Sequence, residues 1–371
     1  MIVSLQLQAA IAQRAGVGRY VHTLAPLLAE RQGNDSLLGF YFDFRNNGSP
    51  FPPGLLKEKP VRWIPGALVQ QAWKRFGFPP YTWFAPKADV HHFPNFVIPP
   101  LPRGPKAVVN IHDAAFLKFP ETLEPKNLAY LRQRMDATVR RADRILTISD
   151  TIADELREHY DLPADKCRTT LLGPPPALTP PDDATAATLL QALNLDRPFL
   201  LHVGTLEPRK NHVFLFKVFE ALKDFDGDLV LCGMEGWHVA PILQALENSP
   251  RRNRIRRLHY LSDPQLAALY LKAEALLFPS LYEGYGLPPV EAMRMGCPVI
   301  TSDGGSLPEV VGDGGTVLPL KRDAWVTAIS RLLTSPDARA ATVNAGRRRA
   351  ASFSWETCAD QTWDVYRELG A

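Results

Sequence analysis

Apolar and polar positions follow two different periods along the first 175 residues. Short apolar runs, typical of buried parallel strands, occur at residues 2–7, 37–42, 89–93, 107–112 and 144–149. Between them, helical spacing is found at residues 18–30, 126–144 and 150–160. In the first of these segments Val21, Leu24, Leu27 and Leu28 share one face. This alternation of strands and helices predicts a doubly wound parallel sheet.

A second series of elements follows the proline-rich segment at residues 173–181. Its sequence, GPPPALTPP, cannot continue a helix or a central strand, so it predicts a linker. Beyond it, apolar runs predict strands at residues 199–203, 228–232, 258–261 and 275–278. Helices are predicted after Asn211, at 264–273 and at 355–369. Both halves therefore have the pattern of a Rossmann-like domain.

The length of the chain agrees with two domains. A chain of 371 residues exceeds what one ordinary hydrophobic core holds. We therefore expect a first domain at residues 1–173 and a second at 174–354. With 46% hydrophobic and 22% charged residues, the composition is that of a soluble globular protein.

Charge is unevenly distributed over the two halves. Residues 1–175 carry 22 Lys and Arg against 16 Asp and Glu, whereas the remainder carries 20 against 23. A basic first half is compatible with an anionic acceptor or a membrane surface, and equally with scatter in surface charge. No nucleic-acid partner is expected.

The sequence has no clear signal peptide, membrane-spanning segment or pattern of paired cysteines. The start, MIVSLQLQAAIAQRAG, lacks a basic leading region and is better interpreted as a strand and loop than as a signal peptide. No run approaches the ~20 apolar residues that span a bilayer, so any membrane contact would be peripheral. The four cysteines are far apart, without zinc spacing, which predicts reduced thiols in a cytoplasmic protein.

The most informative segment follows the apolar run at residues 275–278. Gly284 and Gly286 allow a tight turn and a close approach of the backbone to a ligand. Pro288 and Pro289 suit the first turn of a helix, where a missing N–H costs little. A strand, a glycine loop and a helix N-terminus then meet at one point, which is a place to bind a phosphate.

Two carboxylates flank this glycine loop. Glu283 and Glu291 are separated by seven residues, and Glu291 is predicted in the first turn of the helix. Carboxylates beside a phosphate site can hold hydroxyl groups. A diphosphate next to a sugar and a ribose fits this description, although either residue alone could be a surface Glu favoured by the helix dipole.

A basic pair follows the strand at 199–203. Arg209 and Lys210 come after Gly204 and Pro208, and two adjacent cations can neutralise the charge that develops on a leaving nucleoside diphosphate. Arg can bind two phosphate oxygens as a fork, whereas Lys acts as a point charge. A solvated pair in a loop is the alternative.

Four blocks of the chain resemble glycosyltransferase family 4, the retaining GT-B enzymes with the E-x7-E motif. The resemblance covers nearly the whole chain, and the blocks occur in the order of the family. They are Gly16-Val-Gly18, Ile111-His112-Asp113, the run VGTLEPRKN at 203–211 and the run at 278–309 that contains both glutamates.

The resemblance implies a fold and a division of labour. The fold would be GT-B, with two Rossmann-like domains facing across a cleft. The last helix, residues 355–371, would return to the first domain. The second domain would bind a nucleotide-diphosphate sugar and the first the acceptor. The reaction would retain the anomeric configuration, through front-side displacement, and would require no metal.

The resemblance also assigns roles to residues. Glu283 would hold the hydroxyls of the donor sugar and Glu291 the ribose. His112, Arg209 and Lys210 would share the catalytic site with Glu283. The remaining donor-binding positions contribute mainly backbone atoms and are Gly16, Gly18, Gly204, Tyr260, Leu261, Gly284, Tyr285, Gly286 and Leu287. Of these, Tyr260 and Leu261 would end a strand and contact the nucleobase.

Several patterns have plainer explanations. Gly16 and Gly18 do not complete G-x-G-x-x-G, which argues against a nicotinamide dehydrogenase. The D-x-D pairs at residues 224–228 fall between a helix and a strand, so a polar turn explains them and no metal is expected. A lone histidine such as His112 is more often structural, and His91 and His92 are weaker candidates.

One segment has three open interpretations. Residues 73–84 interleave aromatic side chains with two cations, which suits either lipid headgroups, an acceptor sugar or buried packing.

The predicted function is a retaining glycosyltransferase of cell-surface polysaccharide synthesis. GDP-mannose is the first candidate donor, because the blocks resemble bacterial mannosyl- and rhamnosyltransferases. dTDP-rhamnose and UDP-sugars follow. The acceptor would be a saccharide or a lipid-linked saccharide, with possible peripheral contact at the inner membrane surface. A nucleotide-sugar epimerase or hydrolase, or a non-catalytic binding protein, are the alternatives.

Overall fold

The chain divides into two compact units in the computed structural model, which describes residues 1–12, 16–176, 178–259 and 261–370. The first unit comprises Met1–Ala114, Pro125–Leu172 and Trp355–Ala371, and the second Ala115–Glu124 and Gly173–Ser354. In the predicted linker, residues 173–176 and 178–181 lie outside helices and strands.

The first unit is built on a parallel sheet. Its strand order is β3-β2-β1-β4-β5-β6-β7, and every neighbouring pair is parallel. Pairing of Val3 with both Leu37 and Val90 fixes the register of the central strand. The strands are β1 (Ile2–Gln6), β2 (Ser36–Phe42), β3 (Lys57–Val61), β4 (Val90–Phe93), β5 (Lys106–Ile111), β6 (Arg144–Thr147) and β7 (Cys167–Thr169).

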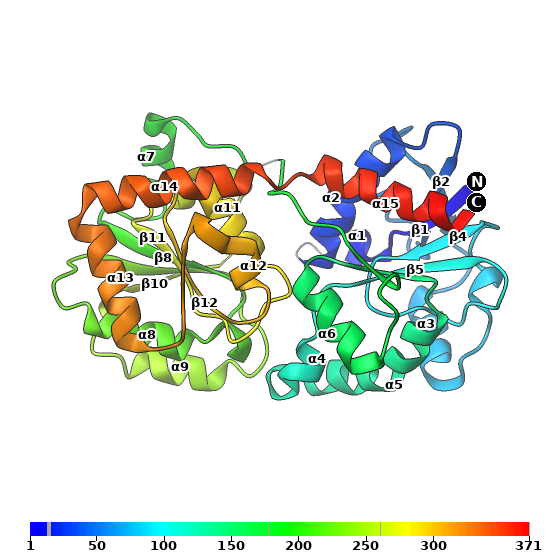
Figure 1. Ribbon diagram of the computed structural model, residues 1–371, viewed down its shortest axis with the longest axis horizontal. Helices are drawn as coiled ribbons and strands as arrows, with labels where there is room; N and C mark the ends of the chain where they lie inside the picture. The colour runs from blue at the N-terminus through cyan, green and yellow to red at the C-terminus, as the bar shows by residue number, and fades with distance from the viewer. Residues whose placement is uncertain (13–15, 177, 260, 371) are drawn as a thin grey trace. The chain divides into compact units, whose positions relative to one another are not determined.

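Helices cover both faces of this sheet (Figure 1). On one face α15 packs against α2 and against β4 and β5. On the other face α3 and α5 are joined by the guanidinium of Arg134, which donates to the Trp73 carbonyl at 3.0 Å. The helices are α1 (Gln8–Ala12), α2 (Val17–Glu30), α3 (Gly66–Phe76), the short η1 (Tyr81–Trp83), α5 (Pro125–Arg141), α6 (Asp150–Tyr160) and α15 (Trp355–Gly370).

The second unit repeats the same order of strands. Its sheet runs β10-β9-β8-β11-β12-β13, again all parallel, which is the strand order 3-2-1-4-5-6 of a Rossmann fold. The strands are β8 (Phe199–Val203), β9 (Asp228–Cys232), β10 (Ile255–Leu258), β11 (Ala275–Phe278), β12 (Val299–Ser302) and β13 (Thr316–Leu318).

Helices again lie on both faces. One core joins α8, α9 and α13 to the sheet around Phe216, Ile242 and Trp325, while α10 contacts α7 and α11, and α11 contacts α14. The helices are α4 (Ala115–Lys118), η2 (Pro120–Thr122), α7 (Asp183–Ala192), η3 (Pro208–Lys210), α8 (His212–Ala221), α9 (Ala240–Glu247), η4 (Arg252–Arg254), α10 (Asp263–Lys272), α11 (Leu287–Met295), α12 (Leu307–Val311), η5 (Gly312–Gly314), α13 (Arg322–Thr334) and α14 (Pro336–Ala351).

Two sequence predictions differ from the structure. Residues 115–124 were expected in the first domain but group with the second unit: the indole N–H of Trp237 donates to the Thr122 carbonyl at 2.6 Å, and the rings of Phe119 and Tyr282 pack 5.6 Å apart. The strand predicted at 258–261 is β10 (Ile255–Leu258) instead. It begins earlier because Ile255 and the arginines after it pair with β9 despite their charge.

The four cysteines are free and buried, and burial raises the pKa of the Cys297 thiol to about 12. Within the described ranges, no helix is both long and apolar enough to cross a bilayer.

Candidate active site

The two predicted chemical motifs of the second unit lie at the centre of its sheet. The basic pair follows β8, and the glycine loop with Glu283 follows β11. Because β8 and β11 are parallel neighbours, both loops leave the same edge of the sheet. Strand order reverses between these strands, and such a switch point at the carboxyl ends is where open α/β sheets bind ligands.

The side chains of these loops form a buried network of charges. Arg209 Nη1 donates to Glu283 Oε2 at 2.9 Å and to the Tyr282 carbonyl at 2.8 Å. Lys210 Nζ lies 2.5 Å from the other oxygen, Glu283 Oε1. Arg209 Nη2 bonds Glu207 Oε1 at 2.8 Å. The structure therefore brings together three residues that the sequence placed in the site, and adds Glu207.

Burial and pairing oppose each other in this network. Burial by itself raises the pKa of the Glu283 carboxyl, but the neighbouring cations outweigh it and hold that pKa at about 2. Burial lowers the pKa of the Lys210 ammonium and raises the pKa of Glu207. Glu283 is thus a carboxylate at neutral pH, held between Arg209 and Lys210, and both of its oxygens already accept hydrogen bonds.

A neighbouring loop holds the backbone around Glu283. Gly305 has a φ of 62°, and a side chain there would collide with the Glu283 carbonyl oxygen. Ser306 donates to the same carbonyl from its N–H at 2.9 Å, and its hydroxyl donates to the Gly284 carbonyl at 2.7 Å. The loop after β12 therefore fixes the glycine loop after β11.

Helix α11 begins one residue after the second glycine of this loop. Gly286 has a φ of 97°, which favours glycine, and Pro288 and Pro289 lie in the first turn, as predicted. Two prolines have no N–H, so this turn offers a ligand fewer donors than a typical helix N-terminus. Glu291, expected in the first turn, is the fifth residue of the helix, because the helix starts at Leu287.

The second glutamate of the motif is enclosed. Glu291 is 2% exposed, and the Tyr270 hydroxyl donates to its Oε2 at 2.8 Å. Desolvation and the neighbouring carboxylate together raise the pKa of Tyr270 well above its usual range. Glu291 is therefore held by α10, and it lies 2.8 Å from a tyrosine that the sequence reasoning did not include.

The other donor-binding predictions have mixed outcomes. Gly204 lies beside the network, since its added side chain would contact the Lys210 stem. Tyr285 is buried, with its ring 6.1 Å from that of Phe353, so only its backbone could meet a ligand. Leu261 is half-buried and follows β10 at a distance of three residues rather than ending it. Tyr260 lies outside the described residues.

Two buried histidines lie beneath Lys210 and were missed by the sequence reasoning. The rings of His202 and His212 are 4.6 Å apart. His202 Nδ1 donates to the Leu277 carbonyl at 2.9 Å. Burial lowers the pKa of His202 to about 4 and that of His212 to about 2. His202 lies near the end of the strand with sequence FLLHV, whereas His212 is the first residue of α8.

The predicted residues of the first unit lie at the start of α2 and directly after β5. Gly16, with a φ of 56°, precedes α2, and Gly18 is buried within that helix. His112 follows β5, and its Nε2 lies 2.8 Å from the Pro94 carbonyl. A carbonyl only accepts, so Nε2 carries the hydrogen and Nδ1 is left as an acceptor. Burial lowers the pKa of His112, which keeps the ring neutral.

A chain of hydrogen bonds between neutral side chains ends at Tyr20, whose ring packs against His112. His92 Nδ1 lies 2.5 Å from the Tyr366 hydroxyl, and His92 Nε2 lies 2.6 Å from Asn110 Oδ1. The Asn110 amide donates to the Tyr20 hydroxyl at 3.0 Å, and the Tyr20 ring packs edge-on against His112 at 4.9 Å. His92, a weaker candidate by sequence, thus links α15 to α2.

Metal ligation was not expected from the D-x-D pairs. Asp226 and Asp228 are instead paired with Arg254, and Asp228 begins β9. In the part of the chain that the structure describes, no group of three or more His, Cys, Asp or Glu side chains is arranged to hold a metal ion.

Comparison with known proteins agrees with this geometry. The family described as glycosyl transferases group 1 matches residues 190–349, and glycosyltransferase family 4 matches residues 14–173. O-antigen chain mannosyltransferase B of Escherichia coli is 35% identical over 288 residues, which cover 76% of this chain and 75% of that protein. O-antigen chain mannosyltransferase RfbU of Salmonella typhimurium is 28% identical over 62% of each chain.

Among solved structures, sucrose-phosphate synthase of Thermosynechococcus elongatus has a TM-score of 0.77 at 21% identity, covering 100% of this chain and 99% of that one. This likeness supports the two Rossmann-like domains of the GT-B class. The chain belongs to glycosyltransferase family 4, and it is a glycosyltransferase similar to O-antigen mannosyltransferases.

Proposed function

We propose that this glycosyltransferase transfers mannose from GDP-mannose to a saccharide or a lipid-linked saccharide, with retention of anomeric configuration, in cell-surface polysaccharide synthesis. Two relatives named as O-antigen mannosyltransferases support the sugar and the pathway. dTDP-rhamnose and UDP-sugars are the alternative donors. We also propose that the enzyme is cytoplasmic and acts at the membrane.

The charge network around Arg209 carries this proposal. Two cations and two carboxylates lie together at the switch point of the second unit. The diphosphate of a donor would compete with Glu283 for Arg209 and Lys210, which releases a carboxylate oxygen for the hydroxyls of the sugar. Glu207 would keep the guanidinium oriented during this exchange.

The same cations would support the chemistry. As the bond between sugar and phosphate breaks, negative charge grows on the leaving nucleoside diphosphate. Cations already fixed at that point stabilise this charge without reorganisation. Arg209 and Lys210 would thereby supply the charge that a metal ion supplies elsewhere. The leaving phosphate would accept the proton of the acceptor hydroxyl on the same face of the sugar.

The first unit would bind the acceptor. His112 presents a neutral imidazole whose Nδ1 can accept a hydrogen bond, at the carboxyl end of β5. A neutral acceptor suits a sugar hydroxyl, because it orients the group without adding charge. Gly16 precedes α2, and Gly18 is the second residue of that helix.

The donor panel tests this proposal. Purified protein would be incubated without added metal with GDP-mannose, UDP-glucose, UDP-N-acetylglucosamine or dTDP-rhamnose, with and without a mannose-terminated acceptor. We expect one donor to yield an extended acceptor with an α-linkage by NMR. Release of free sugar at the same rate without acceptor would show a hydrolase instead, and an altered nucleotide sugar would show an epimerase.

A further inference from the structure

Large apolar side chains on the first unit are exposed in one stretch of sequence. Trp63, Phe76 and Trp83 are 69%, 72% and 64% exposed. Among the described residues, the exposed large hydrophobic side chains are Ile2, Phe44, Trp63, Leu68, Phe76, Phe78, Trp83 and Met234. Five of these eight fall between residues 63 and 83, where chance scatter along the chain would place fewer. A concentration of this kind marks an interaction surface.

Ring contacts join these side chains into one surface. Trp63 stacks on Phe84 with centroids 5.6 Å apart, and Phe78 packs edge-on against Trp83 at 5.1 Å. Trp83 and Phe84 are adjacent in sequence, and Phe76 lies two residues before Phe78 at the end of α3. We call this set, within residues 63–84, the aromatic surface.

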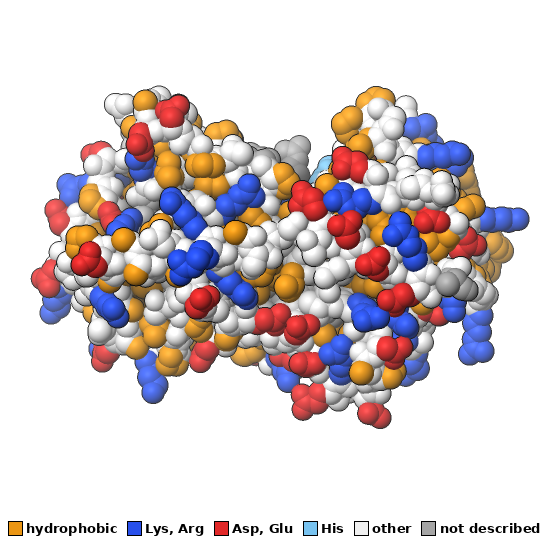
Figure 2. Space-filling model, turned by 45° about the horizontal axis from the view of Figure 1, so that its top comes forward, with side chains coloured by type: hydrophobic (Ala, Val, Ile, Leu, Met, Phe, Trp, Pro, Cys, Tyr) orange, Lys and Arg blue, Asp and Glu red, His pale blue; other side chains and the backbone are white. Residues whose placement is uncertain are grey.

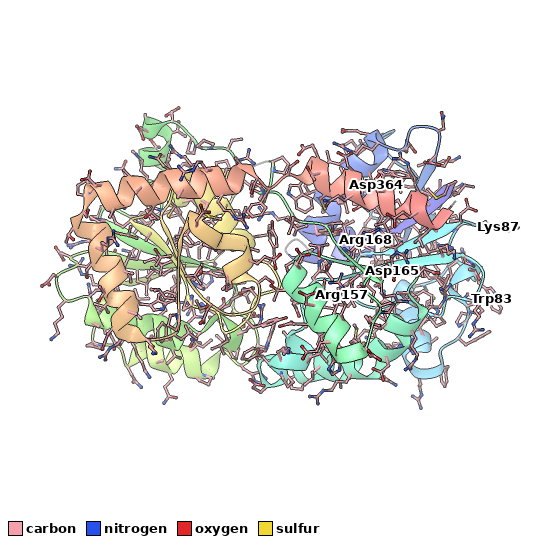
Figure 3. All side chains as sticks on the ribbon, in the orientation of Figure 1. Trp83, Lys87, Arg157, Asp165, Arg168 and Asp364 are labelled. Carbon is pink, nitrogen blue, oxygen red and sulfur yellow. The ribbon has the colours of Figure 1, made fainter. Side chains whose placement is uncertain are left out.

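The stretch around the aromatic surface is basic, although Glu58 and Asp89 flank it and Arg62 lies 3.5 Å from Asp43. Residues 59–88 contain no Asp or Glu, and their cations are Lys59, Arg62, Lys74, Arg75 and Lys87. Arg75 lies over the Phe76 ring at 5.6 Å. Figure 3 shows Trp83 and Lys87 projecting from the same edge of the unit, and Figure 2 shows basic side chains beside hydrophobic ones at that edge.

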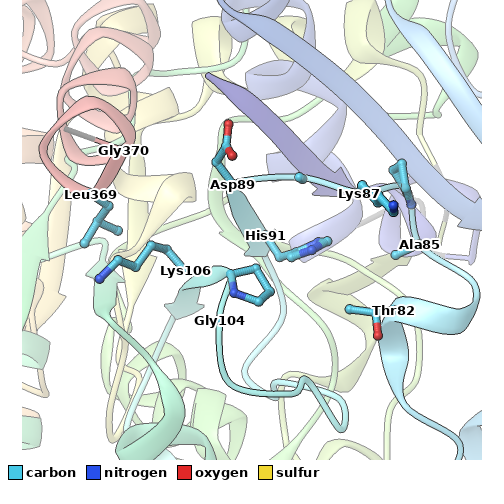
Figure 4. Close-up of a pocket in the computed structure, with 12 residues that line it drawn as sticks. Thr82, Ala85, Lys87, Asp89, His91, Gly104, Lys106, Leu369 and Gly370 are labelled. Carbon is cyan, nitrogen blue, oxygen red and sulfur yellow. The ribbon is translucent and has the colours of Figure 1, made fainter.

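A cavity of about 490 Å³ adjoins this surface (Figure 4). The chain from Thr82 to Asp89 forms one wall, and Lys87 and Lys106 both line it. His91, 1% exposed, also lines it, and within the described residues its Nδ1 has no hydrogen-bond partner. Asp89 lines the cavity as well, where its carboxylate accepts from the Ile2 N–H at 2.7 Å, and Lys106 lies 3.6 Å from Asp143. Lys87 and Lys106 are the two cations that a phosphate group would meet there.

We propose that the aromatic surface docks on an anionic phospholipid bilayer, with a headgroup phosphate entering the cavity between Lys87 and Lys106. Tryptophan and phenylalanine favour the boundary between headgroups and acyl chains, and an uninterrupted basic sequence favours an anionic leaflet over a protein partner with mixed charge. This inference rests on the proposed action at the membrane and deepens it, since it names the surface and the headgroup contact through which the enzyme would bind.

Vesicle sedimentation tests the surface directly. Full-length protein would be mixed with phosphatidylglycerol–phosphatidylcholine vesicles or with pure phosphatidylcholine vesicles. We expect binding to the anionic vesicles and at least tenfold weaker binding to the neutral ones. Each cation near the surface contributes about fivefold, so the double variant Lys74→Gln/Arg75→Gln should bind roughly 30-fold more weakly.

Two further variants separate the apolar and the headgroup contributions. Phe76→Ser/Trp83→Ser removes exposed rings and should weaken binding at least tenfold to anionic vesicles. Lys106→Gln changes the cavity wall outside the aromatic surface and should weaken only the binding to anionic vesicles, by about fivefold. Binding of inorganic phosphate alone in the cavity, with no effect of Lys106→Gln on vesicles, would overturn the headgroup assignment.

Matched controls lie on the second unit. Arg322→Gln/Arg331→Gln removes the same number of charges, and Met234→Ser removes an exposed apolar side chain; both should bind vesicles like the wild type. Equal losses in the controls and the surface variants, or a monomer–dimer change that follows the aromatic substitutions, would overturn the proposal. Circular dichroism would verify folding, and unchanged transfer to a soluble acceptor would keep this test separate from that of the proposed function.

Discussion

The two units share a strand order but differ in the chemistry at the carboxyl edge of their sheets. In the second unit that edge holds paired charges, with Glu283 fixed between Arg209 and Lys210. In the first unit it holds neutral partners, with His92 between Tyr366 and Asn110. The same scaffold therefore provides a charged site in one unit and an uncharged hydrogen-bonding site in the other.

This difference suggests that the second unit would handle the charged donor and the first unit the uncharged acceptor. In the proposed reaction negative charge would develop on the donor side, where the sugar leaves a diphosphate, and the fixed cations would stabilise that charge. A sugar hydroxyl carries no charge, and a neutral histidine can orient it. Burial is common to both networks, so it is the pairing of the buried groups that sets their charge.

The largest effect is expected from breaking the charged network. Arg209→Gln keeps a hydrogen-bond donor but removes the cation, so turnover should fall by about 10²–10³-fold. The affinity for the nucleoside diphosphate should fall as well. Steady-state kinetics and calorimetry measure the two effects.

The exposed Arg252→Gln on the same unit is the matched control, because its side chain is 56% exposed and pairs only at the surface with Glu247. It should leave both quantities unchanged. If Arg209→Gln turned over substrate at the wild-type rate, the charged network would not be part of the catalytic site.

Lowering the pH should reduce the free energy of unfolding of both units. In the second unit the reduction should extend to lower pH. Buried His92 and His202 have pKa values of about 4, below the usual value, so the unfolded chain binds their protons first. The free energy of unfolding then falls as pH drops from about 6.5 to 4, by about 1.4 kcal/mol per pH unit for each histidine. His212 and Glu283, with pKa values of about 2, extend the loss in the second unit below pH 4.

Urea unfolding at pH 7, 6 and 5 measures this slope, and hydrogen exchange locates it in each unit. His92→Gln and His202→Gln should each flatten the slope by the share of one histidine. A slope that neither substitution changes would contradict the burial of neutral rings.

Two tyrosines allow the charged and neutral bonds to be compared directly. Tyr270→Phe removes a donor to the buried carboxylate of Glu291, whereas Tyr366→Phe removes a donor to the neutral ring of His92. Bonds to charged groups contribute about 1.5–3 kcal/mol and neutral ones about 0.5–1.5 kcal/mol. Thermal and urea unfolding should therefore show the larger loss for Tyr270→Phe, and the reverse order would break the comparison.

The smallest effect is expected at His112. His112→Asn should lower turnover by at most about tenfold, since one neutral hydrogen bond contributes roughly 0.5–1.5 kcal/mol. Nucleotide affinity, measured by calorimetry, should not change, because the proposed nucleotide site lies in the second unit. The exposed His159→Asn serves as the control. A loss as large as that of Arg209→Gln would give His112 a role in charge stabilisation.

Local pattern predicted most strands of both sheets, but not β3, β7, β12 or β13. Apolar runs predicted strands near β1, β2, β4, β5 and β6, and matched β8, β9 and β11 to the residue. The helix from Asp150 begins after the capping side chain of Ser149, as its sequence indicates. Edge strands were harder: β3 and β10 carry charges or proline, and only pairing with a neighbouring strand identifies them.

The candidate site was partly visible as well. Glu283, Arg209 and Lys210 stood out because glycines, a proline and adjacent cations follow apolar strands. Glu207 and the histidines beneath Lys210 did not stand out, since a single acid or histidine has no local signature.

The sequence by itself determined the parallel α/β character of both halves, the linker and the residues after the two central strands, because these depend on side-chain period and on backbone restrictions within a few residues. Only the tertiary structure decided which of those residues meet. Glu283 reaches Arg209 across 74 positions because β8 and β11 pair side by side. The ionisation of each group depends on how deeply the fold buries it and which charges it brings within reach, and neither quantity is a property of local sequence.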